Sequence, residues 1–198
     1  MRQAKAQRHT RETRIDVELT LDGTGIADVA TGVGFFDHML TAFALNARFD
    51  LRVRCEGDLE IDQHHTVEDV GIVIGQAFRE AVGDKRGIRR YGSSLLVMDE
   101  ALVRAALDLS GRALAIVEID WQPALGPQGF DYELTSEFVW AFARAAHATI
   151  HIDSLRGRNN HHLCEAAFKA LGRALDEATR ADAKLGDSLP STKGSFDG

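Results

Sequence analysis

The chain has 198 residues, of which 44% are hydrophobic and 27% charged, a composition typical of a folded protein with a substantial core. Its formal net charge of -7 argues against nonspecific nucleic-acid binding, which depends on excess lysine and arginine. No apolar run is long enough to span a bilayer, and residues 1–14 are too polar for a secretory signal. The two cysteines lack CxxC spacing, so we expect reduced thiols and a cytoplasmic protein.

Hydrophobic periodicity in the first half of the chain predicts four short strands and two helices. Residues 15–21 alternate apolar with polar side chains, and we expect 27–31 to return as the pairing partner of that strand. The expected strands are 15–21, 27–31, 49–55 and 59–62, and the expected helices are 35–47 and 64 to about 82.

The second half repeats this order of elements, which indicates an internal duplication. The expected strands are 94–98, 101–109, 113–120 and 149–155, and the expected helices are 132–146 and 161 to about 180. We therefore predict an α+β fold of two similar halves, each a β-sheet packed with two helices. The predicted organisation is one domain over 1–198, made of pseudo-repeats 11–90 and 91–183 and a tail at 184–198.

A five-residue pattern, His-His-x-x-Glu, occurs at residues 64–68 and again at 161–165, and each copy opens the second predicted helix of its half. Positions i and i+4 lie on one helix face, so each first histidine sits over its glutamate. Imidazoles with a carboxylate suit Mn, Fe or Zn better than Ca or Mg. A lone histidine is more often structural than a ligand, but the duplication favours two metals. The candidate ligands are His64, His65, Glu68, His161, His162 and Glu165.

The duplication also predicts a pair of ligands on the first helix of each half. His38 lies 26 residues before the first motif, and Glu137 lies 24 residues before the second. Glu137 is therefore the expected counterpart of His38. The alternative is that Glu137 is a solvated carboxylate on a helix surface.

Several cations could form an anion site, because arginine forks favour phosphate or carboxylate and a lysine adds a point charge. Each of them alone could equally be a solvated surface cation. The tail at 189–194 offers hydroxyls, backbone N–H groups and an ammonium, but it lacks the strand-to-helix context of a P-loop. The residues concerned are Arg86, Arg89, Arg90, Arg112 and Lys169.

The sequence contains no GxSxG or GxGxxG motif and no cysteine with an evident catalytic base, which leaves chemistry centred on metal ions. Two metals with spare carboxylates can polarise a substrate, stabilise an anionic intermediate or activate water. The spacing of the residues does not choose among these reactions.

Linked motifs along most of the chain resemble those of the imidazoleglycerol-phosphate dehydratases, a family of histidine-biosynthesis enzymes. Their number and order make the resemblance specific. The motifs are Arg11-Glu12-Thr13, Phe36-Asp37-His38-Met39-Leu40, Gly57-Asp58, Asp62 to Asp69, Met98 to Ala101, Asp108 to Arg112, Gly157 to His162, Glu165 to Lys169 and Pro190 to Gly194.

The resemblance implies a metal-dependent hydro-lyase that converts imidazoleglycerol phosphate into imidazoleacetol phosphate and water. It implies two Mn²⁺ ions per active site, with the substrate's imidazole bound to metal so that a weakly acidic C–H can be removed. It further implies 24 subunits built from trimers, with active sites at subunit contacts. Neither a nucleic acid nor a membrane is an expected partner.

The resemblance also assigns roles to individual residues. Metal ligands would be His38, His64, His65, Glu68, His161, His162 and Glu165, with Glu137 in place of a histidine common in the family. Catalytic groups would be Glu12, an acid/base that contacts substrate, with Glu68 and Glu165. Phosphate would be bound by Arg90, Arg112, Lys169, Ser191, Thr192 and Lys193.

Three positions depart from the family pattern: Glu137, Ala42 and Asn46. Ala42 stands where some members have a substrate-contacting glutamine, and Asn46 where a histidine is common. The alternatives to a dehydratase are a dinuclear-metal hydrolase of a small phosphate ester, which would release phosphate, and a noncatalytic protein whose metals only assemble subunits.

Overall fold

The structure is a computed structural model that describes residues 1–194 and 196. Its strands are β1 (Gln3–His9), β2 (Thr13–Thr20), β3 (Ala27–Ala30), β4 (Asp50–Gly57), β5 (Tyr91–Met98), β6 (Ala101–Asp108), β7 (Leu114–Glu118) and β8 (Thr149–Arg156). Its α-helices are α1 (Gly34–Ala47), α2 (His64–Val82), α3 (Leu134–Ala146) and α4 (Asn160–Thr179), and a 3₁₀ turn covers Pro127–Gly129.

The strands form two four-stranded sheets with the same topology. The first sheet has the order β1-β2-β4-β3 and the second has the order β5-β6-β8-β7. In each sheet two antiparallel pairs are followed by one parallel pair. The α+β fold of two similar halves is therefore confirmed, while the repeat boundaries at 11–90 and 91–183 stay predictions.

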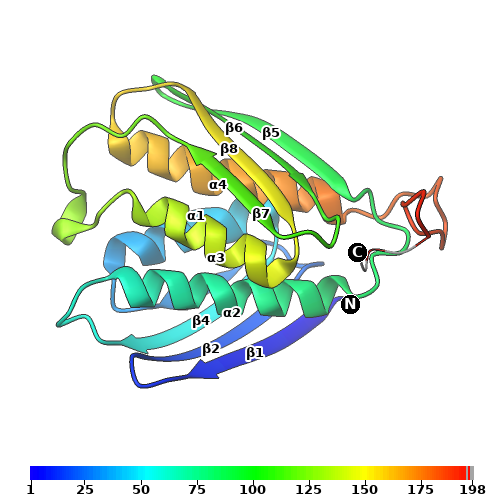
Figure 1. The fold of residues 1–198 in the computed structure, drawn as a ribbon, viewed down its shortest axis with the longest axis horizontal. Helices are drawn as coiled ribbons and strands as arrows, with labels where there is room; N and C mark the ends of the chain where they lie inside the picture. Colours follow the sequence, from blue (N-terminus) through cyan, green and yellow to red (C-terminus); the bar gives the residue numbers. More distant parts are fainter. Residues whose placement is uncertain (195, 197–198) are drawn as a thin grey trace.

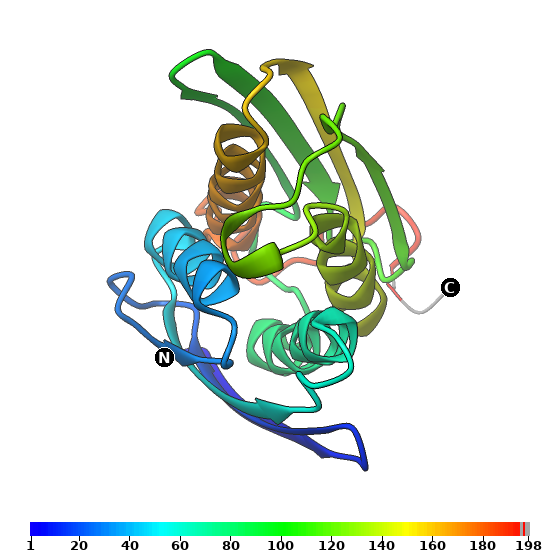
Figure 2. The same cartoon turned by 90° about the vertical axis from the view of Figure 1, so that its left-hand side faces the viewer.

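The four helices lie between the two sheets, as the end-on view in Figure 2 shows. Helices α1 and α2 cover the first sheet, and α3 and α4 cover the second. Across the middle of the molecule α1 packs on α4 and α2 packs on α3, so each helix pair joins the two halves (Figures 1 and 2). None of the helices in the described residues has the length and apolar character that crossing a membrane requires.

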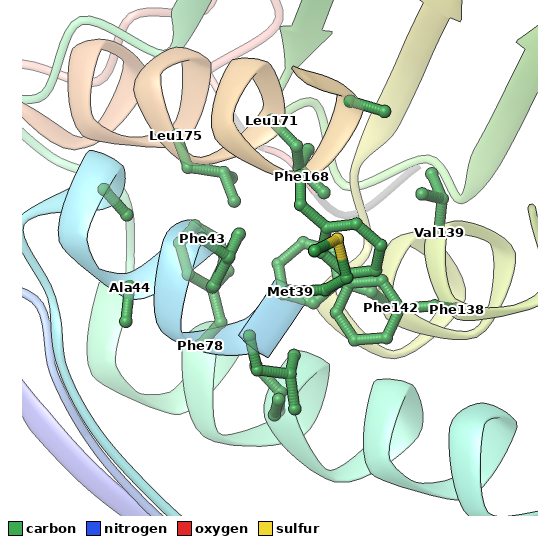
Figure 3. Packing of buried hydrophobic residues seen from close by; sticks show 14 of the residues in the cluster. Met39, Phe43, Ala44, Phe78, Phe138, Val139, Phe142, Phe168, Leu171 and Leu175 are labelled. Atoms are coloured by element: carbon green, nitrogen blue, oxygen red, sulfur yellow. The ribbon is translucent and has the colours of Figure 1, made fainter. Parts of the chain in front are cut away.

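Aromatic side chains fill the space between the helix layers (Figure 3). The ring of Phe138 on α3 lies 5.0 Å from that of Phe168 on α4, and the ring of Phe78 on α2 lies 5.5 Å from that of Phe142. Each of these rings is almost completely buried, which contributes about 1.5–3 kcal/mol per side chain. The core thus fixes the helices that carry both motifs relative to one another.

Two sequence predictions of local structure were wrong, and one strand was not predicted. Residues 3–9 form β1, which the hydrophobic pattern does not predict because this edge strand buries only Ala4 and presents polar side chains outward. Residues 27–30 pair in parallel with β4 rather than with β2, because α1 intervenes as a crossover between β3 and β4. Residues 59–62 form a turn, in which Ile61 is exposed and its N–H donates to the Asp58 carbonyl.

Candidate active site

One cluster of possible metal ligands joins the two halves of the chain. His38 on α1 and His161 on α4 each place Nε2 3.3 Å from Oε2 of Glu165. One ligand atom of each of these three residues lies within 4.8 Å of the others, and within the described residues no other group of three meets this criterion. Because imidazole nitrogens and a carboxylate oxygen converge, the cluster fits a divalent transition-metal ion.

The start of α4 is fixed by a side-chain cap. The Asn159 carboxamide oxygen accepts hydrogen bonds from the backbone N–H groups of His161 and His162, which satisfies donors that a helix leaves open at its N-terminus. This cap sets the direction in which the motif's first turn projects its imidazoles.

Glu165 is buried, and Lys169 neutralises it. The Lys169 ammonium lies 2.6 Å from Oε1 of Glu165. Burial by itself would raise the pKa of Glu165, but the hydrogen bonds from Lys169 and His38 outweigh it and lower the pKa. Glu165 is therefore an anion at neutral pH, as a metal ligand must be. The structure places Lys169 at this carboxylate, on the same helix as the second motif.

The first motif is arranged more openly. His64 Nε2 lies 3.8 Å from Oε2 of Glu68, one helical turn away. Glu137 lies on α3, the helix that packs against α2. Within the described residues, His64, Glu68 and Glu137 do not place their ligand atoms within 4.8 Å of one another, as His38, His161 and Glu165 do.

Packing shows that Glu137 and His38 are equivalent in position. Each lies five residues before a phenylalanine, Phe142 or Phe43, whose carbonyl oxygen faces a glycine on the opposing helix. The correspondence predicted from the sequence spacing therefore agrees with the register of the helix pairs. Ala42, one of the departures from the family, is buried, and Asn46 donates to its carbonyl oxygen.

The second histidine of each motif contacts a carboxylate that residue patterns alone did not single out. His65 Nδ1 lies 3.0 Å from Oδ2 of Asp58, and His162 Nδ1 lies 2.7 Å from Oε2 of Glu100. The hydrogen bond that His65 donates to the Asp58 carboxylate raises the pKa of His65. The hydrogen bond with His162 and the N–H of Asn159 lower the pKa of Glu100 to about 2. The only sequence signal for either acid was its place in a family motif.

Glu12 lies beside the first motif, in the turn between β1 and β2. Its side chain is exposed, and its carbonyl oxygen accepts a hydrogen bond from the Asp58 N–H at 3.0 Å. The neighbouring Thr13 hydroxyl donates to the buried carboxylate of Asp69 on α2 at 2.5 Å, which ties the turn to the motif helix.

The arginines expected to bind phosphate meet at the other end of the helices. Arg90 forms a two-pronged ion pair with Asp108 at 2.7 and 3.0 Å, and its third nitrogen donates to the Pro190 carbonyl. Arg112 Nη2 lies 3.7 Å from the same carboxylate. Pro190 directly precedes the tail residues, so its contact with Arg90 brings the tail's hydroxyls and ammonium to this end of the molecule. Those tail residues are Ser191, Thr192 and Lys193.

The motif histidines and this arginine group are far apart within one chain. The Arg90 N–H donates to the carbonyl of Ala178 near the end of α4, whereas His161 lies at its start. At 1.5 Å per helical residue the two ends are ~26 Å apart. Figure 1 shows α2 and α4 beginning on one side of the molecule and ending on the side where the tail, in red, is found.

Comparison with known proteins decides the family. The family model for imidazoleglycerol-phosphate dehydratase matches residues 31–175. The chain belongs to the imidazoleglycerol-phosphate dehydratase family. A family member from Paracoccus denitrificans is 56% identical over 196 residues, which cover 99% of this chain and all of that protein. One from Hydrogenovibrio crunogenus is 53% identical over 197 residues, covering 99% of this chain and all of the relative.

Solved structures of dehydratases share the fold. The Staphylococcus aureus enzyme matches with a TM-score of 0.81 and 38% identity, covering 91% of this chain and 99% of that one. The Pyrococcus furiosus enzyme matches with a TM-score of 0.82 and 40% identity, covering 96% and 99%. The resemblance seen in the sequence is confirmed: the chain is a dehydratase that removes water from imidazoleglycerol phosphate in histidine biosynthesis. The hydrolase and the noncatalytic protein are thereby set aside.

Proposed function

We propose that the dehydratase works with two Mn²⁺ ions. The observation that carries this proposal is the convergence of His38, His161 and Glu165, since their ligand atoms lie within 4.8 Å of one another. These residues would hold one ion. His64, Glu68 and Glu137, from the equivalent helix pair, would hold the other. His65 and His162 complete a nitrogen-rich donor set that suits Mn²⁺ better than Mg²⁺ or Ca²⁺.

Bound metal would act as a Lewis acid that binds the substrate's imidazole and stabilises negative charge after C–H removal. The protein's own part is to position substrate and move protons. Glu12 is the proposed acid/base. Its main-chain carbonyl is bonded to Asp58, which also contacts His65, and its exposed carboxylate makes no hydrogen bond within the described residues. Glu68 and Glu165 would take part in the reaction as metal ligands, and their carboxylates would set the charge of the site.

The phosphate group is proposed to bind at the arginine end of the chain. Arg90, locked by Asp108 and Pro190, presents a rigid guanidinium there, and Arg112 beside it is largely exposed. Arginine's planar fork suits a phosphate's oxygens. Lys169, although paired with Glu165, would bring positive charge between the two groups. The proposed binding set is Glu12, Arg90, Arg112, Lys169, Ser191, Thr192 and Lys193.

A small substrate does not bridge ~26 Å, so the complete site must combine the motif end of one copy with the arginine end of another. The outer face of the second sheet, rather than that of the first, favours assembly. The first sheet's outer face carries ion pairs such as Lys5–Glu18 and Arg54–Asp28. The second sheet's edge strand instead exposes Leu95 at 63%. We propose a homo-oligomer of 24 subunits built from trimers.

An apolar patch on the second sheet is the surface that such assembly would cover. Its exposed side chains come from β5 at one edge of the sheet and from β8 and β7 at the other, and burying them against another copy would remove apolar area from water. The patch consists of Tyr91, Leu95, Val97, Leu114 and Leu155.

The proposed location is the cytoplasm, with neither nucleic acid nor membrane as a partner. The net charge of -7 disfavours nucleic-acid binding. Cys55 and Cys164 are both free thiols, as is usual in a reducing compartment.

Turnover of imidazoleglycerol phosphate by chelator-treated protein, with and without added Mn²⁺, tests the metal proposal. We expect acetol product only with Mn²⁺, and no release of inorganic phosphate. Full activity in the chelated protein, with metal content below one ion per ten chains, would overturn it.

A further inference from the structure

The duplication makes Glu12 and Glu100 equivalent residues. Each immediately precedes the second strand of its sheet, since β2 begins at Thr13 and β6 begins at Ala101. The register supports this match, because Val17 of β2 pairs with Val53 and the equivalent Ala105 of β6 pairs with Ile152.

The two glutamates nevertheless have different partners. The Glu100 carboxylate accepts from His162 Nδ1 at 2.7 Å and from the N–H of Asn159 at 2.9 Å. The Glu12 side chain has no hydrogen bond within the described residues, although its N–H donates to the Thr10 hydroxyl and its carbonyl accepts from Asp58. In the first half, therefore, a residue other than the equivalent glutamate contacts the motif's second imidazole.

That residue is Asp58, which directly follows β4. Its carboxylate lies 3.0 Å from His65 Nδ1, while its N–H holds the Glu12 carbonyl. The Asp58 side chain is only 17% exposed, so this contact is shielded from water. A carboxylate that accepts from Nδ1–H fixes the tautomer in which Nε2 carries the lone pair that binds a metal.

We propose that Asp58 and Glu100 are matched positioning residues, which hold His65 and His162 by Nδ1 and turn Nε2 of each ring toward a metal. By taking this role in the first half, Asp58 leaves the Glu12 carboxylate to the substrate. The inference rests on the proposed metal function. It explains why two residues at equivalent places in the fold have diverged into a proton-transfer group and a support for an imidazole.

Metal affinity tests the inference independently of turnover. Mn²⁺ is titrated into metal-free protein, and bound and free ion are measured by calorimetry and by the EPR signal of free Mn²⁺. We expect Asp58→Ala to weaken one of the two bound ions by roughly 10–100-fold, the usual cost of losing a partner of a ligating histidine. Asp58→Asn should lose less, because its amide oxygen still accepts from Nδ1–H. Glu60→Gln, an exposed change in the same turn, is the matched control.

The equivalent pair gives a second comparison, which holds even if Asp58→Ala folds poorly. Glu100→Ala should lower Mn²⁺ affinity, because it removes the acceptor for His162 Nδ1–H, whereas Glu12→Ala should leave the affinity unchanged and lower kcat. Equal loss of affinity in these two variants, or wild-type affinity in both Asp58→Ala and Glu100→Ala, would overturn the inference. Failure of the metal proposal looks different, since the wild-type protein would then bind no Mn²⁺.

Discussion

Gly75 on α2 and Gly172 on α4 occupy equivalent positions, each facing a carbonyl oxygen of the helix packed against it. Each lies eleven residues after the first histidine of its motif. A Cβ at Gly75 would lie 2.7 Å from the Phe142 oxygen, and one at Gly172 would lie 2.5 Å from the Phe43 oxygen. Backbone is rigid on this scale, so both helix pairs depend on glycine for their close approach, and with it for the spacing of the candidate ligands.

Replacing either glycine by alanine should destabilise the protein. Helix propensity alone would favour alanine by about 1 kcal/mol, whereas overpacking costs about 1–3 kcal/mol. We expect the clash to prevail, and urea unfolding followed by circular dichroism measures it. Gln76→Ala, an exposed change next to Gly75, should stay within about 0.5 kcal/mol of wild type. Unchanged or greater stability in Gly75→Ala would show that the helices can separate without cost.

Glu137 should behave as a metal ligand because it is the positional equivalent of His38. Glu137→Gln removes the charge and should weaken one Mn²⁺ by more than the roughly 10–100-fold cost of losing an outer contact. Glu137→His should retain two ions. Glu133→Gln, an exposed change one turn earlier on the chain, serves as the control. Two ions bound with wild-type affinity in Glu137→Gln would identify a merely solvated carboxylate.

A site shared between copies predicts complementation of inactive variants. His162→Ala and Arg112→Ala should each lose most activity, because one damages the motif end and the other the arginine end. When both variants are co-expressed and assemble together, some sites combine an intact motif end with an intact arginine end, and activity should partly return. Mixed assemblies as inactive as each variant alone would place the whole site within one chain.

The two thiols should be inert in the folded protein. Burial raises the pKa of Cys164 to about 12 and that of Cys55 to about 11. A raised pKa in the folded state stabilises the fold below the unfolded thiol's pKa near 9.0, and that contribution is lost as pH rises toward 11 and 12. We expect no rapid reaction with a thiol reagent at pH 8, two reactive thiols in denaturant, and weaker resistance to urea at pH 10 than at pH 8. A rapidly reacting native thiol would contradict this account.

Local sequence patterns determined most of the elements and the candidate ligands. The helical spacing of His64 with Glu68 and of His161 with Glu165 depends only on residues four positions apart, so the sequence alone reveals it. The 97-residue repeat likewise exposed the duplication and pointed from His38 to Glu137. Strand β1 was not predicted from the sequence, because an edge strand that faces water has little apolar alternation.

Only the tertiary structure decided which residues meet across the fold. The parallel pairing of β3 follows from the crossover through α1. The contact of Glu100 with His162 joins residues 62 positions apart, which no short pattern encodes, and Asp58 meets His65 only because the turn between β4 and α2 folds back. Arg90 lies at the far end of α4 from the motif histidines, where its N–H donates to the Ala178 carbonyl. Such contacts depend on how buried side chains pack two sheets around four helices, which is a property of the whole chain rather than of any segment.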